Sequence, residues 1–209
     1  MAENNNNTPC ASTGIYDSLR FCPGKTVLPG IRQHVYAIPK RKITAWPTLP
    51  DVEGAADMSA LASYSGNFTL EADAKWVRID LALNKGNIEY ETQGEKPSRT
   101  FLNKLTVSHP GNSEAALGFA RQAVADDLVF AVPQRDGKYR ILGNEMFETD
   151  IKPKGATGEG VTGDISSVSR LKSPMFVRLP SIQARWKQPM TEIFLARQEN
   201  PFSKQEDKP

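Results

Sequence analysis

The chain has 209 residues, of which 39% are hydrophobic and 24% are charged, so it suits one folded domain with extensions and is not disordered throughout. Its net charge of +2 excludes a strong overall electrostatic attraction to nucleic acids. The two cysteines, Cys10 and Cys22, are too few for a disulfide framework or a cysteine-rich metal site.

The two ends of the chain are predicted to be arms around one folded domain. Residues 1–30 are assigned to an N-terminal arm, because the polar, Asn-rich start buries too little apolar surface to offset the entropy of ordering. Residues 198–209 are assigned to a flexible C-terminal tail, and residues 31–197 to a β-sandwich domain. The sequence shows neither a secretory signal nor about 18 consecutive apolar residues, so we expect no membrane insertion.

The first strands of the domain are predicted to be short. Prolines at 23, 29, 39, 47 and 50 interrupt helices and confine strands to short or edge pieces. Short extended runs are predicted over Val35–Ile38 and Ile43–Trp46. Residues 51–63 are predicted to form a loop or a short helical turn.

From Phe68 the hydrophobic period changes to two, which is typical of strands. Val77, Ile79, Leu81 and Leu83 alternate with more polar residues, so we expect a strand with these four side chains on a core. Residues 84–87 have the composition of a tight turn, and the alternation resumes at Ile88, which predicts a hairpin. A loop over 92–99 and a strand over Phe101–Val107 follow.

One α-helix is predicted, near residues 113–126. A Pro-Gly break precedes it, and either Asn112 or Ser113 serves as its N-cap. Its hydrophobic stripe is narrow and rich in alanine, which favours close packing against a sheet. The stripe consists of Ala116, Leu117, Ala120, Ala123 and Val124.

The last third of the chain is predicted to return to strands. Asp136-Gly137 is among the strongest tight-turn dipeptides, and it joins strands over Leu128–Val132 and Tyr139–Leu142. Further strands are predicted over Met146–Ile151, Ile165–Val168 and Met175–Leu179, with a glycine-rich loop over residues 153–163. The predicted fold is mainly β: an antiparallel β-sandwich or barrel with one flanking α-helix and extended N- and C-terminal arms.

The sequence contains no convincing motif for catalysis, cofactor binding or metal binding. Residues 158–163 fit G-x-G-x-x-G, but the residues that follow are β-branched and serine-rich rather than helical, so a dinucleotide site is not expected. Two histidines are too few for a histidine metal cluster. We therefore predict a protein without cofactors that is not an enzyme. A hydrolase stays open as an alternative because of the paired carboxylates Asp73 and Asp80, Glu89 and Glu91, and Asp126 and Asp127.

The one basic triplet is Lys40-Arg41-Lys42. Lysine and arginine side chains neutralise phosphates, so these three residues are candidate phosphate contacts. With the nearby Trp46 they leave a second alternative open, in which the protein is a small β-rich nucleic-acid-binding module.

Residues 128–186 resemble the C-terminal half of tail tube (major tail) proteins of long-tailed bacteriophages, particularly those of Bacteroidetes phages and prophages. The resemblance covers a little over a quarter of the chain, and residues 20–50 do not fit the family's pattern. The segments on which the resemblance rests are VFAVP, the D-G turn with KYRILGN, MFETDI, GATGEGVTGD, ISSVSRL and SPMFVRLPSIQARW.

The resemblance implies a virion structural protein without catalysis. Its copies are expected to form rings, hexameric by analogy, that stack into a tube assembled in the host cytoplasm and through which DNA passes transiently. Other tail or connector proteins are its expected partners, and a head–tail connector or capsid-associated protein is an alternative. The candidate inter-subunit contacts are Asn87, Glu89, Tyr90, Glu95, Lys96, Thr157, Glu159 and Val161.

Overall fold

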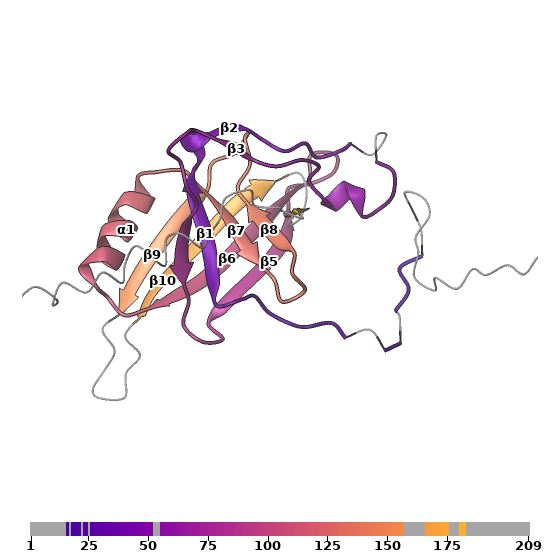
Figure 1. Cartoon of the computed structure of the whole chain (residues 1–209). Helices are drawn as coiled ribbons and strands as arrows, with labels where there is room; N and C mark the ends of the chain where they lie inside the picture. The colour runs from indigo at the N-terminus through magenta and orange to yellow at the C-terminus, as the bar shows by residue number, and fades with distance from the viewer. Residues whose placement is uncertain are drawn as a thin grey trace, which may run out of the picture.

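The computed structural model describes residues 16, 18–21, 23–24, 26–51, 55–156, 166–175 and 180–182. Two antiparallel sheets pack face to face in this part of the chain, with one α-helix beside them (Figure 1). The predicted class, mainly β with antiparallel sheets and one helix, is confirmed. None of the described helices is long and apolar enough to cross a membrane.

The two sheets have different strand orders. The five-stranded sheet has the order β11-β8-β7-β1-β4, and the four-stranded sheet has the order β5-β6-β10-β9. The first comprises β1 (His34–Pro39), β4 (Val77–Asp80), β7 (Leu128–Pro133), β8 (Tyr139–Leu142) and β11 (Ser181–Ile182). The second comprises β5 (Gly86–Gln93), β6 (Thr100–Pro110), β9 (Asp150–Ala156) and β10 (Ser166–Met175).

The remaining elements are a two-stranded ribbon, two 3-10 turns and one α-helix. A ribbon of β2 (Ile43–Ala45) and β3 (Thr69–Leu70) lies outside the two sheets. Two 3-10 turns are η1 (Lys40–Lys42) and η2 (Ala60–Ala62), and the α-helix is α1 (Glu114–Val124). The short extended runs and the helical turn expected before residue 63 are therefore present.

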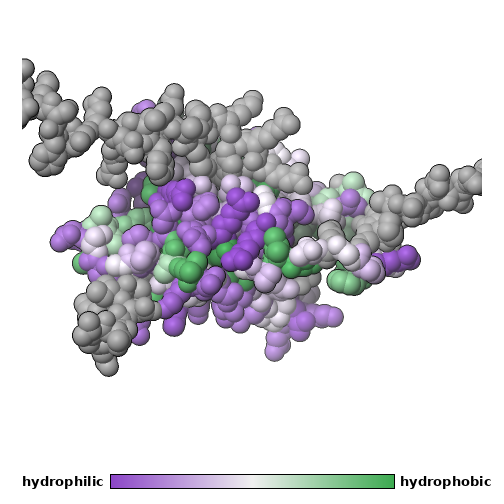
Figure 2. Space-filling model, turned by 60° about the horizontal axis from the view of Figure 1, so that its bottom comes forward, coloured by the Kyte–Doolittle hydropathy of each residue, from purple (hydrophilic) through white to green (hydrophobic). Residues whose placement is uncertain are grey.

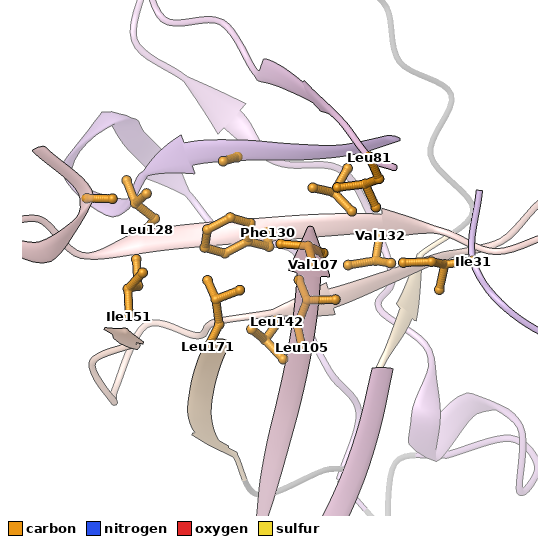
Figure 3. Close-up of a cluster of buried hydrophobic side chains, with 13 residues drawn as sticks. Ile31, Leu81, Leu105, Val107, Leu128, Phe130, Val132, Leu142, Ile151 and Leu171 are labelled. Atoms are coloured by element: carbon orange, nitrogen blue, oxygen red, sulfur yellow. The ribbon is translucent and has the colours of Figure 1, made fainter. Parts of the chain in front are cut away.

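The main core lies between the two sheets. Phe130 of β7 points into this layer, opposite Leu105 of β6 and Leu171 of β10 (Figure 3). All three side chains are almost completely buried. The sheets are thus held together mainly by apolar burial, the dominant favourable term in folding.

A second apolar layer covers the other face of the five-stranded sheet. Phe68 packs edge-on against Trp46 and Trp76, with ring centroids 5.4 and 5.7 Å apart. This aromatic layer belongs to a cluster that includes Val129 and Ala131 of β7. Because both of its faces are covered, β7 is buried at every residue and has the continuous apolar sequence LVFAVP.

The helix agrees with the predicted position near 113–126. Of the two predicted caps, Ser113 is the one used: its Oγ accepts a hydrogen bond from the Ala116 N–H at 3.3 Å. Figure 1 shows α1 beside β9, and Ala123 and Phe119 pack against the main core. The predicted stripe is wrong at Leu117 and Val124, which are exposed, because Phe119 faces the core instead.

The hairpin predicted at Asp136-Gly137 is confirmed. Strands β7 and β8 pair antiparallel, with Val132 opposite Arg140. Gly137 has φ +88°, and its N–H donates to the Gln134 carbonyl at 3.2 Å. Glycine adopts this conformation without the steric cost that a Cβ brings.

The hairpin predicted at residues 84–87 is wrong. Strand β4 pairs with β1 in the five-stranded sheet, whereas β5 pairs with β6 in the other sheet, so this turn carries the chain from one sheet to the other. A Cβ at Gly86 would lie 2.5 Å from Ile31 Cδ1, which shows how closely the backbone passes the core. The expected core positions Val77, the first residue of β4, and Leu83 are exposed; Leu83 lies beyond the end of the strand at Asp80.

Three predicted boundaries also move. Residues 146–149 are not a strand, because the Asn144 side chain accepts from the Phe147 N–H at 2.6 Å and holds a turn there. Strand β9 begins at Asp150 and continues into the predicted loop 153–163. Strand β10 begins at Ser166, continues past the predicted end at Val168 to Met175, and pairs with β6 along its whole length. The strand predicted over Met175–Leu179 lies outside the described residues except for Met175. Residues 157–165 and 176–179 lie outside the described residues.

Candidate interaction surface on the four-stranded sheet

The longest strand edge in the described structure belongs to β5. Its eight residues pair with β6 on one side, and no described strand pairs with the other side. Every side chain from Glu89 to Gln93 is exposed. The strand contains neither a proline nor a bulge, two of the means by which proteins protect an edge from pairing with another chain, and its edge protection is limited to the charges of Glu89 and Glu91. Strand β5 therefore offers an accessible edge.

The predicted contact residues fall on both faces of this edge. Ile88 pairs with the buried Leu105, so the alternation places Asn87 and Glu89 on the outer face of the sheet. Tyr90 lies on the same face of the sheet as Ile88, but 46% of its surface is exposed because the main core ends before it. Three contact candidates in the glycine-rich loop, Thr157, Glu159 and Val161, lie outside the described residues.

Glu95 and Lys96 lie in the loop that joins β5 to β6. Both are exposed, and this loop occupies the end of the β5–β6 hairpin. The structure thus brings five of the eight predicted contact residues to one edge of one sheet. Whether they contact another subunit stays a prediction.

The outer face of the same sheet also carries basic side chains that sequence reasoning missed. They alternate with the buried residues Leu105, Ile151 and Leu171, so all of them project away from the core. The strand register then brings them together, with Lys104 opposite Lys172 and Arg170 opposite Lys152. We call this group the cationic face; it comprises Lys104, Lys152, Lys154, Arg170 and Lys172.

Carboxylates neutralise the charges of only two of the five basic residues on the cationic face. Lys104 Nζ lies 2.6 Å from Glu91 Oε2, and Lys152 Nζ lies 3.1 Å from Asp150 Oδ2. Lys154, Arg170 and Lys172 are exposed and form no ion pair with another described residue. The positive charge therefore concentrates on β9 and β10, while the β5 edge is acidic.

The predicted basic triplet has a different environment from the cationic face. Lys40 Nζ lies 3.3 Å from Asp127 Oδ2, and Lys42 Nζ lies 2.5 Å from Glu71 Oε2. Arg41 forms an ion pair with Asp126. Each of its charges is thus matched by a carboxylate. These pairs tie η1 to the start of β7 and to the residue after β3. Trp46, the aromatic residue considered with the triplet, packs against Phe68 in the aromatic layer.

The candidate carboxylates of a hydrolase do not converge in the described structure. A groove of about 390 Å³ lies between β4 and α1, and Asp80 is the only carboxylate along it. Asp126 and Asp127 lie instead in ion pairs with the basic triplet. Among the described residues no three His, Cys, Asp or Glu side chains are grouped to hold a metal ion.

A signal for the cationic face was present in the sequence. Lys152 and Lys154 are two residues apart, as are Arg170 and Lys172, and a period of two places such pairs on one face of a strand. Comparisons with protein-family models, curated proteins and solved structures found no match. The resemblance to tail tube proteins thus stays a prediction and enters only the proposal below.

Proposed function

We propose that this protein is a self-assembling virion structural subunit of the tail tube type, whose copies join head to tail through opposite edges of the four-stranded sheet. One observation carries the proposal: on the outer face of that sheet the two edges have opposite charges. Strand β5 presents Glu89 and Glu91, and strand β9 presents Lys152 and Lys154 with a single carboxylate, Asp150. A second copy of this chain therefore has a complementary edge.

The charge pattern favours a head-to-tail contact over a symmetric dimer. Two β5 edges would bring glutamates together, and two β9 edges would bring lysines together, and like charges that face each other across strands are destabilising. A β5 edge beside a β9 edge brings opposite charges together instead. Head-to-tail contacts form a ring when the rotation between subunits closes, which the tail tube resemblance places at six copies.

The two edges contribute differently to this contact. Strand β5 offers backbone groups along eight residues, so it can accept another strand. Strand β9 contains Pro153, which has no N–H, and α1 packs beside this strand, so β9 does not offer an unbroken backbone ladder. Side-chain ion pairs therefore contribute more to the register of the contact than an unbroken ladder would.

The assembly can be tested by exchanging charge between the two edges. Glu89→Lys and Lys154→Glu should each reduce ring or tube formation, because each places like charges at the contact. Mixing the two variants, or combining both changes in one chain, should restore assembly. Negative-stain electron microscopy and sedimentation velocity measure the product, and Glu91 is left unchanged because it pairs with Lys104.

Lys138→Glu is the matched control, since Lys138 is exposed in the β7–β8 turn, away from both edges. It should assemble like the wild type. Wild-type protein that stays monomeric at every concentration would contradict the proposal. So would a mixture of the two edge variants that assembles no better than either alone.

A further inference from the structure

We infer that the cationic face is a binding surface for the phosphate backbone of nucleic acid. This goes beyond the proposed assembly and does not require it, because all five basic residues belong to one subunit. It also differs from the sequence-based prediction, which placed phosphate contacts at the basic triplet. The triplet is neutralised by carboxylates, whereas most of the cationic face is not.

The register of the sheet brings the basic side chains together. Lys104 lies directly opposite Lys172, and Arg170 lies directly opposite Lys152. Neighbouring strands are only about 4.8 Å apart, so each of these pairs brings two like charges close together. Each pair contains one lysine that already has a carboxylate partner, so the charge left over lies on Arg170 and Lys172. A polyanion that lies across β6, β10 and β9 would neutralise this remaining charge.

The composition of the face suits phosphates better than an acidic protein. Thr106, opposite Arg170, is partly exposed on the same face, and hydroxyl groups donate hydrogen bonds to phosphate oxygens. The centres of protein–protein interfaces are instead depleted in lysine and enriched in aromatic residues. No aromatic side chain alternates with the cations on β9 and β10 in the described residues. We therefore expect contacts to the backbone without base recognition.

The face has a border that limits the bound region. Glu89 and Glu91 lie along β5 on one side, and Asp150 lies at the first residue of β9. Arg170 and Lys172 form no ion pair with another described residue and lie on the central strand β10, where the register places Lys172 opposite Asp150. Phosphate contacts should therefore centre on β10. These two residues are also distinct from the edge residues of the proposed assembly, so the two proposals can be tested separately.

The test is fluorescence anisotropy with labelled duplex DNA, single-stranded DNA and single-stranded RNA of equal length. Wild-type protein should bind all three, and its affinity should fall steeply between about 50 and 200 mM salt. For duplex DNA, a plot of the logarithm of the affinity against the logarithm of the salt concentration should have a slope of about −0.9 per phosphate contact. Arg170→Gln combined with Lys172→Gln should weaken binding about tenfold and make the salt slope shallower by about 2.

The matched control is Lys75→Gln combined with Lys138→Gln, which removes two exposed charges away from this face. It should bind like the wild type, and both double variants should keep the wild-type melting temperature. Wild-type protein that binds none of the oligonucleotides would overturn the inference, as would equal binding by the Arg170 and Lys172 variant. Binding to polyglutamate but to no oligonucleotide would identify an acidic protein as the partner and would also overturn it. Nucleic-acid binding without rings or tubes would count against the proposed assembly alone.

Discussion

At the scale of single residues, the aromatic layer contains the most perturbed titratable group in the described structure. Burial raises the pKa of Tyr64 to about 12, from an ordinary value of 10.0. Its ring lies 6.3 Å from that of Phe68, between centroids. The phenol must therefore stay neutral while the layer is intact, since ionisation would place a charge in apolar surroundings.

This pKa predicts a loss of stability in alkali that Tyr64→Phe should reduce. Below pH 10 the tyrosine is neutral in both states, so its protonation does not affect unfolding. Between pH 10 and 12 the unfolded chain releases a proton that the folded chain keeps, and unfolding becomes more favourable. Urea unfolding at pH 8 and at pH 11 measures how much of the free energy of unfolding is lost between these two pH values. This loss should be about 1 kcal/mol smaller in Tyr64→Phe than in the wild type. Equal losses in the two proteins would contradict the prediction.

At the scale of elements, local signals predicted some turns and failed at others for one physical reason. The Asp136-Gly137 turn joins two strands of one sheet, so its local sequence specifies both the turn and its pairing. The turn at residues 84–87 has a similar composition, but the chain leaves it toward another sheet. Whether a strand pairs with its neighbour or crosses to another sheet depends on long-range packing, here around Leu81 and Ile31.

Replacing a glycine with alanine should have opposite effects on the stability of the protein at Gly137 and at Gly118. Gly137 has φ +88° and open space where an alanine Cβ would lie, so Gly137→Ala should cost about 1 kcal/mol from backbone conformation alone. Gly118 lies in α1, also in open space, where alanine is the better helix former, so Gly118→Ala should stabilise the protein by about 0.8 kcal/mol. Urea unfolding measures both changes, and effects of the same sign would show that local conformation does not decide them.

At the scale of the whole molecule, the face shown in Figure 2 is mostly hydrophilic, with hydrophobic residues scattered over it. Such scatter is ordinary for a protein surface, so charge is the more informative surface property here. The sequence analysis named Asn87 and Glu89 as contact candidates, and both lie on strand β5, within a few residues of each other. It did not predict the cationic face, whose members lie up to 68 residues apart, from Lys104 to Lys172, and meet only through the register of three strands.

The layered arrangement predicts that the aromatic layer and the sandwich unfold together. Strand β7 is buried on both faces, so the layer around Trp46 and Trp76 packs on the same sheet that forms the main core. With Trp186→Phe as background, tryptophan fluorescence reports on the layer and far-ultraviolet circular dichroism reports on the sheets. The two urea transitions should coincide. Phe68→Ala should shift both by the same amount, since the layer cannot detach without exposing β7 to water; a fluorescence transition at lower urea would instead make the layer a separate unit.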